Sequence, residues 1–534
     1  MQARSLARMA AVVGVAYVLS NLTGLGQRII VTSQFGTSVE YDAFNAAFRI
    51  PDLLFSLLAG GALASAFIPT FTARLSRNQQ TLAWKLALAV AGLVFIVMSA
   101  FAVIAALAAP FIIRSIVAPG FDDGQVALTA ALMRLMLIST VIFGVSGLLM
   151  GVLQSNNSFL APAIAPSIYN IGIMFGALAL RGQGIYGVAT GVVVGAALHL
   201  AVQLPALARV LLRSRVINRA ADVAAQTATA AGELADDVRK VIRLMLPRIV
   251  GLGAVQINLI VTVSLASGMG EGAVSALNIA FATLILPQAA IAQAIATVLF
   301  PTISAHAARG EHGEFARSLT RAINVVIALS APAAIGLILL GQPIIRLLFQ
   351  RNTFNAQSTD AVAFALAWYG AGLVGHSVLE VVTRGFYALH DTYRPVILSV
   401  ASMIANVALS LILAAVFRAN SLPPYGGLAL ANSVATALET ALLYAWLAHR
   451  VPQLNLKLTV IASVKSTIAA GVMAAALWLW LNVLGNGTLA ALLAIVAGIA
   501  VYFGAAWALR SEETGFAVNI LRAKLLRRRL SAET

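Results

Sequence analysis

Long apolar runs, separated from one another by short polar loops, recur along the whole chain. Each run has the length of about 20 residues that an α-helix needs to cross a bilayer, so the pattern predicts about fourteen membrane-spanning helices. The expected spans are 9–32, 43–69, 84–109, 127–152, 160–180, 184–207, 241–266, 273–300, 319–340, 359–386, 394–417, 425–448, 459–483 and 488–509. We expect an all-α polytopic membrane protein, because transmembrane β-strands alternate polar and apolar residues and these runs do not.

The two halves of the chain resemble each other. PFIIRSIVAPGFDD (110–123) aligns with PIIRLLFQRNTFN (343–355), and AFIPTFTARLSRNQQ (66–80) aligns with VLFPTISAHAARGEH (298–312). Both matches share an offset near 233 residues, which corresponds to six expected spans. An even number of spans gives the halves the same orientation, so we expect a parallel repeat of two six-helix lobes around a central cavity.

The repeat predicts four parts of the chain. They are an N-terminal lobe at 1–208, a cytoplasmic linker at 209–240, a C-terminal lobe at 241–450, and two extra helices with a basic tail at 451–534. The stretch 214–243, which covers most of the linker and the first residues of the next lobe, is rich in Ala and charge. Two interpretations stay open for it: a helix lying on the membrane surface, or a solvated connector that only joins the lobes.

Composition agrees with a membrane protein. The chain has 534 residues, of which 60% are hydrophobic and 10% charged, and its mean hydropathy is +0.92. The net charge of +16 comes from basic residues in alternate short loops, which predicts both termini on the cytoplasmic side and not a nucleic-acid partner. No cleavage site follows the basic start MQARSLAR, so we expect an uncleaved first span.

The sequence lacks the motifs of several enzyme classes. It contains no phosphate-binding P-loop, paired-His zinc motif or nucleophile elbow, and it has no cysteine. An ATP-driven pump or a membrane hydrolase would need such machinery. We therefore expect a protein that is not an enzyme, has no catalytic residue, cofactor or metal, and works through binding and ion gradients.

Charged side chains within the expected spans are the main functional signal, because burying a charge is costly unless a cavity or a partner receives it. A cluster of arginines suits a pyrophosphate or carboxylate, whose oxygens match the guanidinium group bidentately. We therefore predict a substrate site in a water-filled space of the first lobe. Its candidate residues are Asn21, Arg28, Asp42, Arg49, Asp52 and Arg248, with Arg134 as a further arginine that could converge on it.

Other interpretations are open for some of these residues. Arg49 and Asp52 stand one helical turn apart, where they would neutralise each other. Arg134 lies close enough to a helix end to snorkel, and Arg248 follows Pro247 at a helix start, where it would fix topology. Arg28 lies on the expected outer side, where the positive-inside bias disfavours a plain anchor.

The tenth expected span carries a second constellation. His376, Glu380 and Arg384 recur every four residues and therefore form one stripe along one helix. A histidine beside a glutamate can pass protons, which would make this stripe an ion-coupling site. A local ion pair explains Glu380 and Arg384 equally well.

Several segments carry a family likeness. They are YDAFNAAFRIP (41–51), GALASAFIPTF (61–71), GVLQSNNSFLAPAIAPSIYNIGI (151–173), LPRIVGLGAVQINLIV (246–261), LFQRNTFNAQSTD (348–360) and TRGFYALHDTYRPV (383–396). Together they resemble the MurJ/MviN lipid II flippases of the multidrug/oligosaccharidyl-lipid/polysaccharide exporter superfamily. The resemblance implies two six-helix lobes around a cavity, plus two helices that form a groove for a polyprenyl tail. It also implies transport of lipid II to the outer leaflet by alternating access.

The resemblance transfers functional residues unevenly. Asp42 and Arg49 match an acidic and a basic residue of the family's second span. Several charged family positions are neutral here, namely Asn21, Gln27, Phe55, Ser56, Gly60 and Ala282. Arg28 is one residue beyond Gln27 and so points about 100° away around the helix. Some members bind sodium in the second lobe, and the matching positions here are Asn406, Ser410 and Asn432.

The resemblance predicts a lipid II flippase in a bacterial inner membrane, with a polyprenyl-pyrophosphate-linked glycopeptide as its substrate. The other expected partners are the lipid bilayer and cell-wall synthesis proteins. Two alternatives remain because family arginines are missing: a flippase for another polyprenyl-linked glycan, and a non-transporting scaffold for cell-wall synthesis.

Overall fold

A computed structural model describes residues 2–59, 61–77, 79–214, 227–485 and 487–511. Helices make up nearly all of this part of the chain, and no strand occurs among the described residues. The expected all-α fold is confirmed. The chain forms two compact units. Unit 1 comprises Met1–Val274 with Arg351–Phe354, and unit 2 comprises Ser275–Gln350 with Asn355–Thr534.

The number of membrane-crossing helices differs from the expectation. Within the described residues, ten helices are long and apolar enough to cross a membrane, or eleven if the bent pair Ala356–Ala371 and Leu373–Ala388 forms one span. The expected count of fourteen is therefore not confirmed. The three expected spans without such a helix are 9–32, 43–69 and 241–266. These spans contain charged residues or helix breaks, and some of their side chains are not among the described residues.

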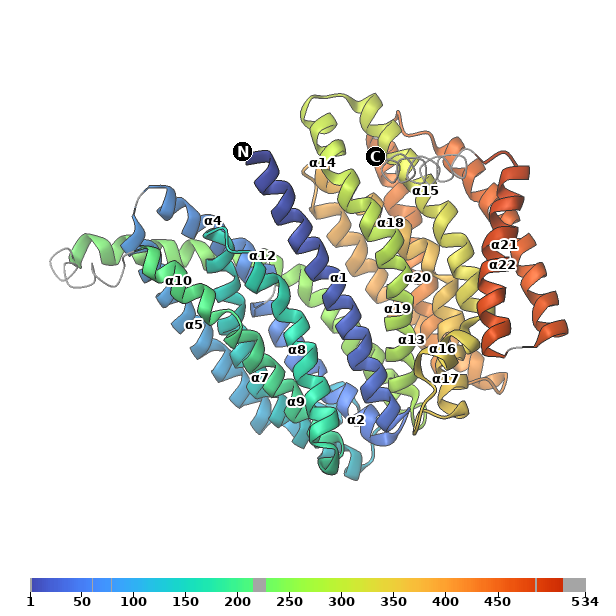
Figure 1. The fold of residues 1–534 in the computed structure, drawn as a ribbon, viewed down its shortest axis with the longest axis horizontal. Coiled ribbons are helices and arrows are strands. Elements are labelled where there is room, and N and C mark those ends of the chain that lie inside the picture. The colour runs from blue at the N-terminus through green and yellow to red at the C-terminus, as the bar shows by residue number, and fades with distance from the viewer. Residues whose placement is uncertain (1, 60, 78, 215–226, 486, 512–534) are drawn as a thin grey trace, which may run out of the picture. The chain divides into compact units, whose positions relative to one another are not determined.

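Unit 1 is built around a long central helix. Its elements are α1 (Gln2–Phe35), α2 (Val39–Ala47), α3 (Arg49–Leu54), η1 (Phe55–Ala59), α4 (Gly61–Ser76), α5 (Gln80–Leu107), α6 (Ala109–Ile112), η2 (Ile113–Val117), α7 (Asp123–Ser155), α8 (Leu160–Ala179), η3 (Arg181–Gln183), α9 (Ile185–Ala201), α10 (Leu204–Ser214) and α12 (Thr227–Ser267). A capping box between Asp122 and Gln125 fixes the start of α7. Helices α2, α4, α5 and α9 pack against α7, while α1 runs beside α8 (Figure 1).

The expected second span is not one straight helix. It is divided into α2, α3, η1 and α4, and η1 is a π-helical turn. Such turns disturb the regular hydrogen-bond ladder and bend the helix that contains them. The ring of Phe55 in η1 packs 4.9 Å from that of Phe143 on α7, so the break is held against the centre of the unit.

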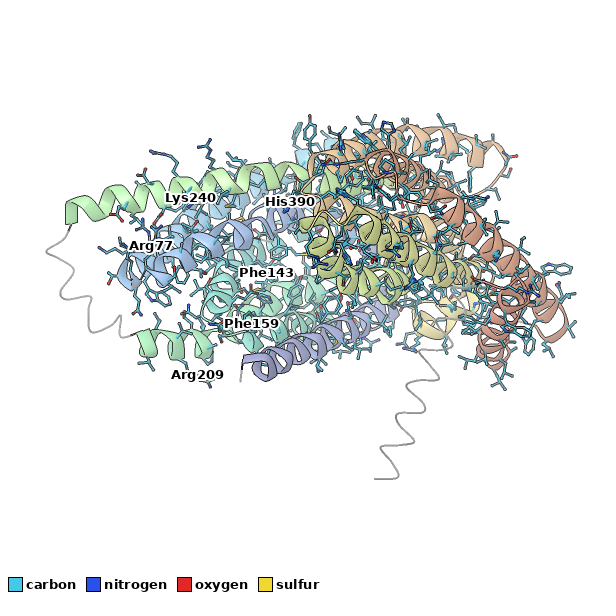
Figure 2. The ribbon with its side chains drawn as sticks, turned by 90° about the horizontal axis from the view of Figure 1, so that it is seen from above. Arg77, Phe143, Phe159, Arg209, Lys240 and His390 are labelled. Atoms are coloured by element: carbon cyan, nitrogen blue, oxygen red, sulfur yellow. The ribbon has the colours of Figure 1, made fainter. Side chains whose placement is uncertain are left out.

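The linker region is partly helical. Residues 215–226 lie outside the description, and from Thr227 the chain continues without a break through the expected seventh span as α12. Arg74 at the end of α4 donates 2.7 Å hydrogen bonds to Glu233 and Asp237 of α12. Figure 2 shows Lys240 on this stretch of α12 and Arg77 beside the end of α4. The second half of the linker is thus tied to unit 1 by ion pairs.

Unit 2 follows a related plan. Its elements are α13 (Ala273–Gln288), η5 (Ala289–Gln293), α14 (Ala294–Ala308), α15 (His312–Leu339), α16 (Gly341–Phe349), α17 (Ala356–Ala371), α18 (Leu373–Ala388), α19 (Tyr393–Ala419), α20 (Tyr425–Arg450), α21 (Leu456–Leu484) and α22 (Thr488–Ala508). One core joins α14, α15, α18 and α20. The last two helices, drawn in red in Figure 1, pack on α15, where the Tyr502 hydroxyl donates to the Ala328 carbonyl at 2.7 Å.

The repeated segments adopt similar local structures. In the first half, PFIIRSIV forms α6 and η2, and Asp122 then caps the long helix α7. In the second half, PIIRLLF lies in α16, and the Asn355 side chain then caps α17. A short helix, a loop and a side-chain cap therefore recur at the two places that the sequence repeat aligns.

Close packing of α8 on α9 depends on glycine and gives a first prediction. A Cβ at Gly176 would lie 2.4 Å from the Gly187 carbonyl oxygen and from the Gly191 Cα. We expect Gly176→Ala to lower stability by about 1–3 kcal/mol, because the helix backbones must separate. The measurement is the midpoint of thermal unfolding in detergent. Gly182→Ala is the control, since its Cβ meets no atom within 4 Å; equal midpoints for the two variants would contradict the prediction.

Candidate functional site

The helix break in unit 1 carries the charged pair of the predicted substrate site. Arg49 begins α3, and Asp52 follows one turn later, just before the π-helical turn. The Gln256 amide of α12 donates to the Asp52 Oδ2 at 3.4 Å and to the Ser56 hydroxyl at 2.7 Å. The Asp52 carboxylate thus has a fixed hydrogen-bond donor, and Gln256 ties the broken helix to α12.

Gln256 is a residue that the sequence analysis did not single out. It lies within LPRIVGLGAVQINLIV, and a polar side chain in such an apolar run could have marked it as a candidate. Its two acceptors precede it by about two hundred residues, and no local pattern predicts a contact at that separation.

Asp42 lies at the beginning of α2 and is almost completely buried, with 1% of its surface exposed. Its Oδ2 accepts a 2.7 Å hydrogen bond from the backbone N–H of Gly272. Gly272 has a φ of +79°, and a Cβ there would lie 2.6 Å from the Thr37 carbonyl oxygen, so only glycine fits. Asp42 therefore holds the loop that follows α12 against the start of α2.

Two further contacts connect loops of unit 1. The Gly120 N–H donates to the Ser267 hydroxyl at 3.0 Å, and the Thr353 N–H donates to the Ser33 carbonyl at 3.1 Å. Together with the Asp42–Gly272 bond, they join the ends of α1, α2 and α12 to the loops before α7 and α17. We call this set of three hydrogen bonds the loop clasp.

The other candidate residues of unit 1 lie in different surroundings. Asn21 and Arg28 are exposed on α1, and the Asn21 amide donates to the Tyr17 carbonyl at 3.2 Å. Arg134 donates through Nε to the Ala106 carbonyl at 2.9 Å, a contact that fits a cation at the C-terminal end of α5. Arg248 lies in α12, and its side chain is outside the described residues.

The stripe on α18 lines a cavity in unit 2. The cavity has a volume of about 280 Å³, and its lining comprises Gln288, His376, Leu379, Glu380, Thr383, Arg384 and Tyr387. Arg384 donates to Glu380 at 2.9 Å, so the local ion pair considered for these two residues is present. The His376 ring lies 3.0 Å from the Asn432 side-chain oxygen on α20, which links two of the predicted ion-coupling residues.

The remaining ion-coupling candidates lie on α19. Asn406 and Ser410 are buried one turn apart. The described residues contain no group of three or more His, Asp or Glu side chains that could hold a metal ion. A carboxylate that the sequence analysis passed over, Glu439, is buried on the neighbouring α20 with 8% of its surface exposed. The Ser399 hydroxyl of α19 donates to Glu439 Oε1 at 2.6 Å.

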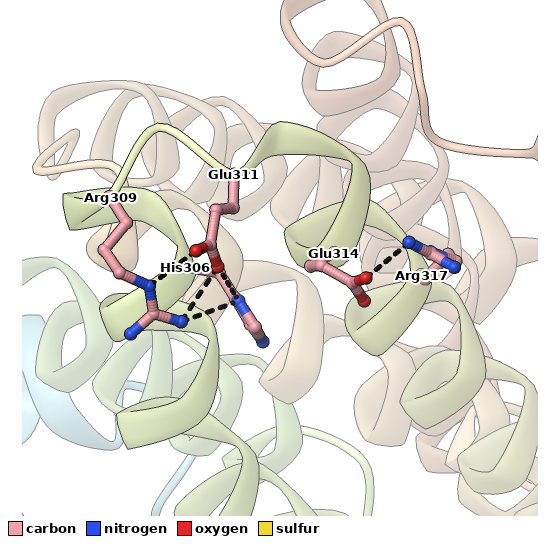
Figure 3. Close-up of polar contacts among 5 residues, drawn as sticks. All are labelled: His306, Arg309, Glu311, Glu314 and Arg317. Carbon is pink, nitrogen blue, oxygen red and sulfur yellow. Dashed lines mark hydrogen bonds and ion pairs between the residues drawn. The ribbon is translucent and has the colours of Figure 1, made fainter.

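A charged cluster surrounds the loop between α14 and α15 and includes residues from the adjoining ends of both helices. The Glu311 carboxylate accepts from Arg309 Nε at 2.7 Å and lies 2.6 Å from His306 Nδ1. Figure 3 shows these contacts and, next to them, the ion pair of Glu314 with Arg317. The hydrogen bonds from Arg309, and next those from His306, lower the pKa of Glu311 from an ordinary 4.5 to about 2.

The cluster predicts a pH dependence. Because the pKa of Glu311 is lower in the folded protein, its ion pairs stabilise the fold fully above pH 4.5, and the contribution is lost as the pH falls through about 2. We expect Arg309→Ala to raise the carboxyl titration midpoint toward 4.5, measured by NMR of labelled glutamate. Arg317→Ala, which removes the partner of Glu314 instead, should leave the Glu311 midpoint unchanged. An unshifted midpoint in Arg309→Ala would contradict this account of the cluster.

Comparisons with known proteins agree on one family. The family described as "MurJ: Lipid II flippase MurJ" matches residues 31–498. A relative from Rhizobium meliloti (strain 1021), described as a probable lipid II flippase MurJ, is 31% identical over 94% of this chain and 94% of its own length. The lipid II flippase MurJ of Burkholderia cenocepacia is 29% identical over 81% of this chain and 82% of its own length.

Solved structures share the fold. A lipid II flippase MurJ in an inward closed conformation aligns with a TM-score of 0.76 at 22% identity, covering 92% of this chain and 97% of that chain. An inward-facing multidrug resistance transporter of the MATE family, in the MOP superfamily, aligns with a TM-score of 0.65 at 16% identity, covering 82% of this chain and 94% of that chain. At these identities the likeness concerns the fold.

Proposed function

The chain belongs to the lipid II flippase MurJ family, and from this membership we propose that it carries the lipid-linked peptidoglycan precursor lipid II from the inner to the outer leaflet. The match to the family over residues 31–498 is the observation that carries the proposal. The apolar helices suit a substrate that stays in the bilayer. The family is described as a lipid II flippase, and its activity is therefore transport and not a chemical reaction.

The substrate site in this proposal lies at the broken helix of unit 1. Arg49 and Arg28 bind the pyrophosphate, because guanidinium groups pair bidentately with its oxygens. Asp52, held by Gln256, positions Arg49 and balances its charge between substrates. Asn21, Asp42 and Arg248 complete the proposed set. The hydrogen bond from Gly272 gives Asp42 a part in joining loops as well.

Alternating access is the proposed mode of transport. The lobes at 1–208 and 241–450 expose the site to one side of the membrane and then to the other, while 209–240 links them and 451–534 adds two helices and a basic tail. The π-helical turn in the second span is a suitable place for bending, because its hydrogen bonds are irregular. We place both termini on the cytoplasmic side of a bacterial inner membrane.

Ion coupling is proposed for unit 2. His376 and Glu380 line one cavity, and the His376–Asn432 contact connects that cavity to α20. Asn406 and Ser410 extend the polar positions along α19. Proton transfer at His376 and Glu380 fits these side chains better than sodium binding, since the sodium positions of the family carry the neutral Ser410 here.

Depletion of the protein in its host tests the substrate. We expect wall synthesis to stall and lipid II to accumulate in the inner leaflet, because export would be blocked while synthesis continues. Accumulation of a different polyprenyl-linked glycan with normal lipid II would favour the second candidate, a flippase for that glycan. The neutral residues Phe55 and Ser56 at charged family positions are the observation behind this candidate.

A scaffold for cell-wall synthesis proteins is the remaining candidate, and it would recruit partners without moving lipid. Liposomes that contain only the purified protein separate transport from scaffolding. A flippase will export lipid II in them, whereas a scaffold will not.

A further inference from the structure

A row of polar side chains follows one face of α19. Ser399, Ser402, Asn406 and Ser410 are spaced by three, four and four residues, which places them on one helical stripe. Ser399 donates to Glu439 and Ser402 donates to the Ala435 carbonyl at 3.2 Å, so the stripe faces α20. Asn406 and Ser410 are buried. A polar seam therefore runs between two apolar membrane-spanning helices of unit 2.

Glu439 is the only carboxylate that the described contacts place in this seam. It lies fourteen residues after Tyr425 and eleven before Arg450, near the middle of a helix with the length and hydropathy of a membrane span. Burying an ionised carboxylate at that depth costs free energy unless a cation or water stabilises the charge or a proton neutralises it. Ser399 is exposed on α19, so the buried carboxyl group is hydrogen-bonded to a residue at the surface of unit 2.

No ion pair among the described residues includes Glu439, although charged groups occur on every helix packed against α20. They are Asp360 on α17, His376, Glu380 and Arg384 on α18, Arg394 and Arg418 on α19, and His449 and Arg450 on α20 itself. Arg384 pairs with Glu380, while Arg394 and Arg450 pair with Asp391. His376 contacts Asn432, which is seven residues or about 10 Å along α20 from Glu439. The basic groups are thus engaged elsewhere or lie at helix ends.

We propose that Glu439 is a proton-binding site of this protein, with Ser399 as the hydrogen-bonding partner that positions its carboxyl group. A proton fits better than a metal cation, because sodium needs several oxygen ligands and the described polar contact of Glu439 is a single hydroxyl that donates to it. On protonation an O–H bond forms on the carboxylate, and an O–H bond of a hydronium ion breaks to leave water. No other group changes its bonds.

Protonation would govern the conformation of unit 2. The neutral acid is compatible with tight packing of α19 on α20, whereas the carboxylate favours an arrangement that admits water. Coupling of this step to lipid export rests on the proposed function, but the proton site itself does not. The two can therefore be tested apart.

Infrared difference spectroscopy of the purified protein in liposomes tests the proton site directly. We expect a carbonyl stretch from a protonated carboxyl group that appears as the pH falls and is lost in Glu439→Gln. Ser399→Ala should keep the band but shift its frequency, because the carboxyl loses its hydrogen-bond donor. Glu314→Gln, at an exposed ion pair near the start of α15, is the matched control and should retain the wild-type band.

The same liposomes, loaded with lipid II, test coupling. We expect the export rate of the wild type to depend on pH and that of Glu439→Gln to lose this dependence. A band that persists unchanged in Glu439→Gln overturns the proton site, and so does a Ser399→Ala spectrum identical to wild type if Glu439→Gln does not fold. A titrating band without any lipid export supports the proton site and contradicts the proposed function instead.

Discussion

Arg49→Ala should abolish growth of a strain that depends on this protein, while the amount of protein in the membrane stays at the wild-type level. Arg49 stands at the start of α3, where the second span breaks, and its guanidinium is the proposed ligand of the pyrophosphate. Removing one partner of a desolvated charge pair costs roughly 2–5 kcal/mol, which is more than tenfold in affinity. The measurement is complementation under depletion, with membrane levels followed by immunoblotting.

Two variants sharpen the interpretation of Arg49. Arg49→Lys keeps the charge but loses the bidentate fork, so we expect growth that is slower than that of the wild type but better than that of Arg49→Ala. Arg77→Ala removes an exposed arginine beside the end of α4 and should grow like wild type (Figure 2). Full growth of Arg49→Ala would remove this residue from the substrate site.

Asp42→Leu should also cause a large loss of transport, for a structural reason. The substitution leaves the buried N–H of Gly272 without its acceptor, which costs about 1–3 kcal/mol, and it opens the loop clasp. Asp42→Asn keeps an oxygen that can accept this bond, so we expect most of the activity to remain. The measurements are complementation and the midpoint of thermal unfolding for both variants.

The pair of Asp42 variants also separates two roles. If the negative charge of Asp42 acts on the substrate, then Asp42→Asn will be as inactive as Asp42→Leu and will unfold at the wild-type midpoint. If the contact with Gly272 dominates, activity and unfolding midpoint will fall together in Asp42→Leu only.

The sequence predicted the long apolar helices well, because a continuous run such as 84–109 specifies a helix by itself. It did not predict the break at η1, where Gln256 of α12 hydrogen-bonds to Asp52 and Ser56, about two hundred positions earlier in the chain. We also expected 214–243 to be a segment separate from the next span. In the structure one helix, α12, continues from Thr227 to Ser267, because the Ala-rich composition of the linker favours helix.

The candidate site was predictable in its residue types more than in its contacts. Intramembrane charge drew attention to Arg49 and Asp52, and the four-residue spacing correctly placed Glu380 and Arg384 side by side. The partners of Asp42 and Arg134 are a backbone N–H and a carbonyl, which have no sequence signature. The same charge rule applied to 425–448 would have found Glu439, since it is an acidic residue in an apolar run.

Export of lipid II by the purified protein in liposomes is the most direct test of the account. The liposomes contain lipid II in both leaflets and this protein as their only protein. Transfer of lipid II from the inner to the outer leaflet is followed by labelling or protease protection. The account predicts export by the wild type and at least a tenfold slower rate for Arg49→Ala. Folded wild-type protein that moves no lipid II in either direction would contradict it.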